Sequence, residues 1–515
     1  MKVFYGKYLV WIPLVFVCGF FLFRSVYFPV HDFANYYFGG VFLSEGHFSS
    51  SVYFPYSFNK AISEMGHQGI FASYAPNSPF LAFVFAPFSL LPLSVAKIIF
   101  NAGSICLFLL SLKRLVSFYR IDPVFVLLIP VLFLIPLKND ILFGQVYFLL
   151  FFLIAENWLA YQQNYFKLSA FLLAFAILLK VFPVLLVLIF VFKKDIRYLF
   201  FVVVFLSVLI LLSIIFTGID IWIFYLWEVL PKASNGKISE AYVTNYQSVF
   251  MFFKELLVWN KTENPNAFFN VPILFLALIL AFKIILIAIG FYITQKANNS
   301  LFVIAYWVLA MVLISPYGST YTFILLLLPY FLLVRSPLSN PKKAMGCFLL
   351  FVVCNIPVSS VTHFPFSYFR LLALLLFFWI LISWVLYTIE IRYVFAVTIS
   401  AFLLMVLFRK NESVNSDYAL EKPPILIYDY VMSGNRLTYF YWNENGETTS
   451  EITLESNASE AAEMRQNQVF YHNRQLTSDN SNKIKPVIVG DKTLLYLSDY
   501  ERGIGFYTLR KMKIN

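Results

Sequence analysis

The chain has 515 residues, of which 60% are apolar and only 13% are charged, and its mean hydropathy is +0.76. This composition excludes a water-soluble globular protein. A formal charge of +11 would suggest a nucleic-acid partner in a soluble protein, but here Lys and Arg gather in short loops between apolar segments, where they set membrane orientation. The sequence therefore predicts an all-α polytopic membrane protein whose partner is a lipid bilayer and which binds no nucleic acid.

Apolar runs of about 20 residues, the length that crosses a bilayer, recur along the chain. The first is too long for a removable signal peptide and no small-residue cleavage site follows it, so we expect it to stay in the protein. Together the runs predict a bundle of about 13 transmembrane helices. In chain order the candidate spans are 8–28, 78–93, 94–113, 121–138, 144–164, 167–193, 198–216, 268–293, 300–316, 320–335, 343–360, 366–388 and 391–408.

Basic residues predict how this bundle is oriented. Lys2 and Lys7 precede the first span, and further basic groups occupy alternate loops near 193–197, 295–296, 335–343 and 390–392. By the positive-inside rule the amino terminus is cytoplasmic. Two large loops, 29–77 and 217–267, and the carboxyl-terminal region are then outside.

The loop with Lys113, Arg114 and Arg120 leaves two topologies open. It is external if 78–93 and 94–113 both span the membrane. It is cytoplasmic if 78–93 only dips into the membrane and 167–193 is a hairpin of two half-helices broken near Pro183. We favour the first topology, because 167–193 has a natural length for one proline-kinked helix.

The sequence changes character after Phe408. Residues 410–515 are polar, and their apolar residues alternate as in β-strands, for example in the runs 425–428, 437–442 and 493–497. The segment 443–447 predicts a hairpin turn, and the alanines of 454–468 indicate one short helix. We therefore divide the chain into a membrane domain, 1–409, and a small extracytoplasmic β-rich domain, 410–515.

Asp32 is the leading candidate for chemistry. It directly follows the first span, so its carboxylate is expected at a membrane boundary, at the head of the long loop 29–77. The other interpretation is structural, because Asp is a favoured N-cap and a helix is expected over 33–44. His31, its neighbour, is either a loop residue or a substrate contact.

Lys180 lies inside an apolar run, about ten residues or more from either end. A lysine there must snorkel, pair with another group or meet an anion, and a lipid phosphate is one anion that fits. Polar clusters also occur where external loops meet spans, and each is either an ordinary turn or a substrate contact. The candidates in these clusters are Asn245, Ser248, Ser315 and Tyr321.

Seven short motifs occur in the order expected of glycosyltransferase family 87, and the chain resembles that family over roughly residues 8–335. They are Asp-Phe-x-x-Tyr-Tyr from Asp32, Tyr-x-Pro-x-x-Pro from Tyr74, Pro-Phe-x-x-Leu-Pro from Pro87, Gly144-Gln145-Val146, Leu-Lys-x-x-Pro from Leu179, Asn-x-x-Ser from Asn245, and Ser315-Pro316. The resemblance implies a GT-C fold. It also implies an enzyme like the polyprenyl-phosphate-sugar-dependent mannosyl- and arabinofuranosyltransferases of bacterial envelopes.

The resemblance assigns roles to several motif positions. Asp32 matches the acidic general base of the first external loop, and Gln145, Lys180 and Tyr74 match the donor-lipid site. His31, Tyr36 and Tyr37 are assigned to the substrate. The sequence departs from the family at two motifs. Family members commonly have Tyr-Pro-Pro where this chain has Tyr74-Ala75-Pro76, and many have Trp and His after the late Ser-Pro, where this chain has Ser319 and Tyr321. Because this chain lacks that His, the resemblance assigns no second acid–base or phosphate-contacting residue there.

These residues predict an integral membrane glycosyltransferase. It would transfer mannose or another hexose or pentose from a polyprenyl-phosphate donor, a co-substrate, to a glycolipid or glycan acceptor on the extracytoplasmic face of a bacterial plasma membrane. One carboxylate suffices for an inverting single displacement. We expect no cofactor and see no metal-ligand cluster, although a divalent metal stays open. The alternatives are a lipid-linked glycan transporter or flippase, or an envelope scaffold without enzymatic activity.

Overall fold

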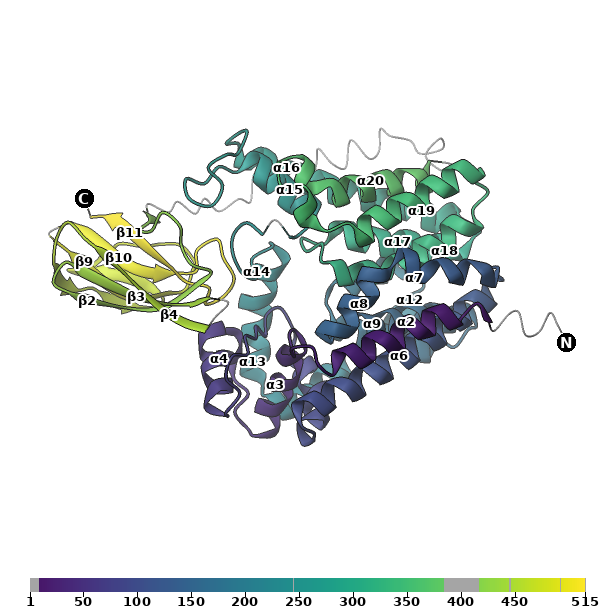
Figure 1. The fold of residues 1–515 in the computed structure, drawn as a ribbon, viewed down its shortest axis with the longest axis horizontal. Helices are drawn as coiled ribbons and strands as arrows, with labels where there is room; N and C mark the ends of the chain where they lie inside the picture. The colour runs from purple at the N-terminus through teal and green to yellow at the C-terminus, as the bar shows by residue number, and fades with distance from the viewer. Residues whose placement is uncertain (1–8, 244, 384–415, 444–445, 491, 515) are drawn as a thin grey trace.

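A computed structural model describes residues 9–243, 245–383, 416–443, 446–490 and 492–514. Helices form one body, and the carboxyl-terminal strands form a second body at one end of it, next to α4 and α13 (Figure 1). The α-helices are α2 Ile12–Ser25, α3 Phe33–Ser44, α4 Pro55–Glu64, α5 Pro79–Phe85, α6 Leu93–Phe118, α7 Ile129–Leu132, α8 Leu134–Phe143, α9 Tyr147–Gln162, α10 Phe166–Leu179, α11 Val187–Phe192, α12 Ile196–Thr217, α13 Ile219–Phe224, α14 Leu230–Ser234, α15 Val249–Leu257, α16 Pro272–Lys296, α17 Ser300–Ile314, α18 Leu327–Arg335, α19 Asn340–Asn355 and α20 Phe369–Ile382.

Tighter or wider turns join several of these helices. The 3-10 segments are η1 Ser50–Tyr53, η2 Ala86–Leu90, η3 Pro123–Leu128, η4 Phe182–Leu186, η6 Thr320–Leu326, η7 Val358–Ser360 and η8 Phe366–Tyr368, and a π-helical segment, η5, covers Tyr225–Val229. Three of them, η2, η3 and η4, contain a proline near their start, where the missing N–H is not needed.

Three helices of the described chain are long and apolar enough to cross a bilayer alone: α6, α12 and α16. A fourth candidate is the pair Pro123–Leu132 and Leu134–Phe143, which bends by 67°. Pro136 explains the break, because its ring excludes a helical contact with the carbonyl of Leu132. The remaining apolar helices are shorter, so the predicted count of 13 spans is not confirmed. The predicted span 391–408 and the end of 366–388 lie outside the described residues.

The predicted single helix over 167–193 is wrong, since the segment folds as two half-helices. Lys180 is extended (φ −148°, ψ 128°) between α10 and η4, and Pro183 cannot donate to the carbonyl of Leu179. Ser169 and Phe190, near the two outer ends, both contact Tyr198, through a hydroxyl pair at 2.8 Å and ring centroids 4.0 Å apart respectively. The segment is therefore a hairpin with Lys180 at its tip.

The hairpin changes which loops share an end of the bundle. Tyr119, which follows Lys113 and Arg114 just after the end of α6, has its hydroxyl 3.2 Å from that of Ser300. Trp158 donates to the same hydroxyl, and Lys193 lies over the ring of Trp158. The loop with Lys113 thus joins the other basic loops, as in the second topology above. We call the end of the bundle where these basic loops gather the basic end. The opposite end, which carries Asp32, is called the Asp32 end.

The carboxyl-terminal region is β-rich, as predicted. Its sheets have the strand orders β1-β11-β10-β9-β5, β2-β3-β4 and β6-β7-β8. The strands are β1 Asp417–Tyr418, β2 Leu426–Ser433, β3 Arg436–Asn443, β4 Gly446–Thr453, β5 Ala458–Ala461, β6 Glu463–Arg465, β7 Gln468–Tyr471, β8 Arg474–Gln475, β9 Lys483–Val489, β10 Thr493–Ser498 and β11 Thr508–Lys513.

Two local predictions in this region have opposite outcomes. The predicted hairpin is confirmed by its strands, because β3 and β4 pair antiparallel up to Asn443 opposite Gly446; residues 444–445 of the predicted turn lie outside the described residues. The short helix over 454–468 is wrong. Its residues form β5 and β6, which pair with β9 and β7. Pairing with β9, more than 20 residues further along the chain, and with the adjacent β7 overrides the weak helix preference of a few alanines.

The β-rich region docks on the loops at the Asp32 end. Gly503 donates its backbone N–H to the carbonyl of Ser239 at 2.8 Å, and a Cβ on Gly503 would lie 2.3 Å from the carbonyl atoms of Ile238. Only glycine permits this approach. The ring of Tyr56, on α4, stacks on Tyr428 of β2 with centroids 4.1 Å apart. We call this contact, together with its ion pairs, the β dock.

Candidate active site

Asp32 immediately precedes α3, but its carboxylate does not cap the helix. Its Oδ2 instead accepts a hydrogen bond from Nε2 of Gln145 at 2.5 Å, and Nδ1 of His31 lies 3.3 Å from Oδ1. The side chain is 28% exposed. The N-cap interpretation therefore fails, and the carboxylate keeps lone pairs for a further partner.

Gln145 owes its position to the turn between α8 and α9. Gly144 ends α8 in the left-handed region (φ +68°), and a Cβ there would lie 2.7 Å from Cβ of Phe33. The buried Gln145 amide then bridges Asp32 and Tyr36, whose hydroxyl donates to Oε1 at 2.6 Å. Burial, and then the charge of Asp32, raise the pKa of Tyr36 well above its usual value, so Tyr36 remains a hydrogen-bond donor.

Lys180, at the hairpin tip, lies close to this group. Its Nζ donates to Oδ1 of Asn77 at 2.9 Å, and it is 5.5 Å from the ring centroid of Tyr36 and 6.0 Å from that of Tyr147. All of these partners are neutral. The ammonium is therefore fixed in place by an amide and two aromatic faces, and no carboxylate of the described residues forms an ion pair with it.

A cavity of about 330 Å³ opens beside Lys180. Leu178, Val181, Phe182 and Leu185 are among its apolar lining residues, and its polar lining includes two lysines, several tyrosines and four serines. The polar side chains are Ser78, Tyr147, Lys180, Tyr225, Ser234, Tyr246, Lys283, Ser315, Tyr317, Ser319 and Tyr321. An apolar wall with cations and hydroxyl donors suits a ligand that joins a hydrocarbon chain to an anionic, oxygen-rich group.

Other predicted site residues lie away from the cavity. Tyr74 is fully buried and donates its hydroxyl to the carbonyl of Ser78 at 2.9 Å, and Tyr37 donates to the carbonyl of Leu91 at 2.8 Å. The ring of His31 stacks on that of Phe143 at 4.0 Å. These contacts give each side chain a structural function, and a substrate role for any of them stays a prediction.

The loop before α15 contributes one of its polar residues to the cavity lining. Ser248 caps α15 by accepting from the N–H of Met251, and it donates to the carbonyl of Pro316 at 2.7 Å. Asn245 is exposed. Their neighbour Tyr246 does line the cavity. The loop therefore reaches the cavity through Tyr246, which we did not single out, and a substrate role for Asn245 or Ser248 stays a prediction.

Three further residues at the site were missed from the sequence. Asn77 holds Lys180, Tyr225 has a buried hydroxyl that contacts no hydrogen-bond partner among the described residues, and Lys283 lines the cavity from the middle of α16. Lys283 could have been found by the criterion that identified Lys180, an ionisable residue inside an apolar helix.

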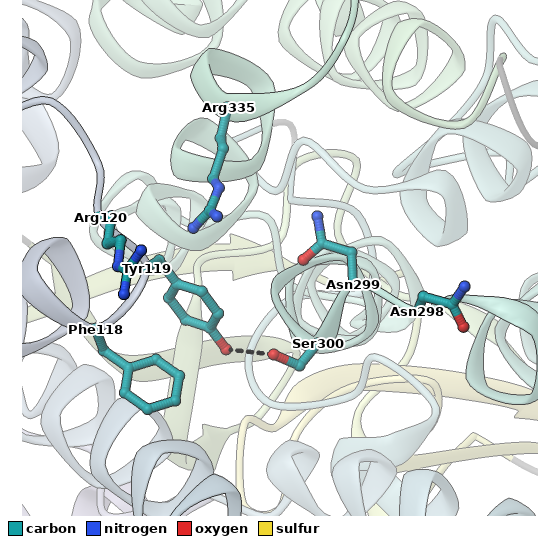
Figure 2. A pocket seen from close by; sticks show the side chains of 7 residues that line it. All are labelled: Phe118, Tyr119, Arg120, Asn298, Asn299, Ser300 and Arg335. Carbon is teal, nitrogen blue, oxygen red and sulfur yellow. Dashed lines mark hydrogen bonds between the residues drawn. The ribbon is translucent and has the colours of Figure 1, made fainter.

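A second pocket, of about 510 Å³, lies at the basic end (Figure 2). Arg120 and Arg335 line it with Asn298, Asn299 and Ser300. This pocket has no carboxylate among its lining residues, so it offers no general base. Nor does any part of the chain that the structure describes bring together three His, Cys, Asp or Glu side chains.

The fold and the site define a helical membrane protein with a lysine-bearing, largely apolar cavity. Asp32 does not line this cavity, but Gln145 and Tyr36 link its carboxylate to the lining residue Lys180. The family model of glycosyltransferase family 87 matches residues 76–316 of this chain. The resemblance is thereby confirmed over these residues, and the match indicates a glycosyltransferase. The match includes Gln145, Lys180 and Lys283 and begins after Asp32. No curated protein matches the chain.

Proposed function

We propose that this glycosyltransferase moves a sugar, mannose or another hexose or pentose, from a polyprenyl-phosphate donor to a lipid or glycan acceptor. The observation that carries the proposal is the Asp32 carboxylate, which makes no capping hydrogen bond to α3. Gln145 and Tyr36 link it to Lys180, a lining residue of the cavity. A lipid-linked phosphate suits this cavity better than a nucleotide, because most of its wall is apolar.

The proposed reaction is a single displacement. The acceptor hydroxyl attacks the anomeric carbon and passes its proton to Asp32, while the bond from that carbon to the phosphate oxygen breaks and its electron pair stays on the oxygen. Lys180 offsets the phosphate charge in a low-dielectric site. Gln145 holds the carboxylate, and Tyr36 holds Gln145, so the base is oriented before the acceptor binds.

The distribution of basic residues supports an extracytoplasmic site. Arg114, Arg120, Lys193 and Arg335 gather at the end opposite to Asp32, and basic loops favour the cytoplasm. Asp32 and the β dock are then on the outer face, in our proposal of a bacterial plasma membrane.

One feature also fits a flippase for lipid-linked glycans. The half-helices that meet at Lys180 resemble the broken helices that transporters use near the membrane midplane. A transporter has no need of a general base, however, whereas Asp32 is accessible and oriented. We therefore prefer sugar transfer.

The test uses the full chain in lipid vesicles. Polyprenyl-phosphate mannose and polyprenyl-phosphate arabinofuranose, each labelled in the sugar, are offered separately, with GDP-mannose as the nucleotide donor and vesicle glycolipids as acceptors. We expect labelled glycolipid from a polyprenyl-phosphate donor and none from GDP-mannose. Transfer from GDP-mannose alone, or movement of labelled donor across the membrane without any transfer, would overturn the proposal.

A further inference from the structure

Lys283 is a charged residue in the middle of a long apolar helix that borders the cavity. It lies in α16, whose apolar window has a mean hydropathy of 2.9. At a rise of 1.5 Å per residue, it is about 16 Å from Pro272 and about 20 Å from Lys296 along the helix. A lysine side chain cannot reach either end, so snorkelling does not explain it.

The surroundings of Lys283 offer its charge no partner. It lines the same cavity as Lys180, and it forms no hydrogen bond or ion pair with any residue that the structure describes. Lys180 differs, since Asn77 and two tyrosine rings already hold it. A charge without a partner inside a spanning helix is costly. A lysine at such a position is therefore expected to bind an anionic ligand.

The proposed reaction changes the charge of the lipid phosphate. The sugar donor is a phosphodiester with one negative charge. After the sugar leaves, the product is a phosphomonoester, whose second pKa of about 6 gives it close to two negative charges at neutral pH. The second charge develops as the bond to the anomeric carbon breaks. A second cation in the cavity would therefore stabilise the transition state and product more than the donor.

We infer that Lys283 binds the departing lipid phosphate and offsets the negative charge that sugar transfer adds to it. This inference rests on the proposed function. Lys180 then balances the charge already present in the donor, and Lys283 balances the charge that appears during the reaction. The apolar wall at Phe182 and Leu185 receives the adjoining hydrocarbon chain.

Binding measurements test this inference without relying on turnover. The probes are farnesyl phosphate, its monoanionic methyl ester and uncharged farnesol, titrated into the full chain in nanodiscs. The variants are Lys283→Met, Lys283→Arg and, as a matched control, Lys296→Met at the exposed end of the same helix. Thermal unfolding of each variant verifies that it is folded; the loss of an unpaired charge from α16 should not lower the midpoint.

We expect Lys283→Met to weaken farnesyl phosphate binding about 10- to 100-fold, the value of one charged hydrogen bond. The methyl ester should lose much less, Lys283→Arg should retain most of the affinity, and Lys296→Met should match the wild type. Equal losses for both phosphates, or none, would overturn the role of Lys283. If the wild type binds farnesol as tightly as farnesyl phosphate, the proposed function itself fails.

Discussion

The cavity and the β dock both contain buried or half-buried cations. They differ in whether a carboxylate lies within ion-pair distance of each cation. In the β dock, Lys232 lies 3.2 Å from Asp499, Lys237 lies 2.9 Å from Glu501, and Arg502 lies 3.3 Å from Glu263. In the cavity, neither Lys180 nor Lys283 has a carboxylate within ion-pair distance among the described residues.

The difference separates a structural contact from a binding site. A buried charge with a fixed partner stabilises one arrangement of the chain, and removal of the partner is costly. A buried charge that lacks one leaves room for an anion from outside the protein. Variants that alter one region should therefore change ligand use, and variants that alter the other should change stability.

The largest effect is expected for Asp32→Asn, which keeps the shape of the side chain and removes its basicity. If Asp32 takes the acceptor proton, the transfer rate should fall by about 10²- to 10⁴-fold. Asp122→Asn is the control, because Asp122 caps a 3-10 segment at the other end of the bundle and Asn caps equally well. Initial rates of sugar transfer measure both, and near wild-type turnover of Asp32→Asn would remove Asp32 from the mechanism.

The second prediction compares one lysine from each region. Lys180→Met should weaken binding of a polyprenyl-phosphate donor about 10- to 100-fold, because a charge-assisted contact in a low-dielectric site is lost. Lys180→Arg should restore part of the affinity. Lys232→Met, which removes a cation from the β dock, should leave the donor Kd unchanged. Equal donor affinity in Lys180→Met and the wild type would contradict the distinction between the two regions.

The third prediction concerns the most buried pair of the β dock. The Arg502 side chain is 1% exposed and that of Glu263 is 10% exposed, so Arg502→Met leaves a buried carboxylate unpaired. We expect a loss of about 3–5 kcal/mol in the free energy of unfolding. Arg465→Met, in an exposed pair with Glu463, should cost about 1 kcal/mol or less. Denaturant unfolding of the full chain in detergent compares them, and similar costs would disprove the assignment.

The smallest effect is a change in pH dependence. Burial alone would raise the pKa of Glu501, but Lys237 and Lys254 hold it below its ordinary value of 4.5. Ionised Glu501 therefore stabilises the fold fully above pH 4.5, and this contribution disappears as the pH falls through its lower folded-state pKa. Glu501→Gln should lose less stability on acidification than the wild type. Parallel unfolding midpoints between pH 6 and pH 3 would contradict the prediction.

The sequence was most informative where a polar residue stands in an apolar context. Asp32 and Lys180 were found in this way, and both lie at the candidate site. The contact of Asp32 with Gln145 joins residues separated by 113 positions, so only a resemblance to a family, and no local pattern, could place them in one site.

Local patterns failed where tertiary packing decided the outcome. The length of 167–193 fits one kinked helix as well as a hairpin, and the choice depends on contacts of both ends with Tyr198. The strands within 454–468 form because β7 and β9 are available as partners. Almost all of β7 and the whole of β9 lie beyond the segment itself.

The most direct test of our central claim is a cryo-electron microscopy map of the full chain with a non-transferable polyprenyl-phosphonate mannose. The account predicts a phosphonate oxygen within about 3 Å of Nζ of Lys180, the hydrocarbon chain along Phe182, and the sugar facing the Asp32 carboxylate. Density for the head group between Arg120 and Arg335 at the basic end, or a sugar turned away from Asp32, would contradict it.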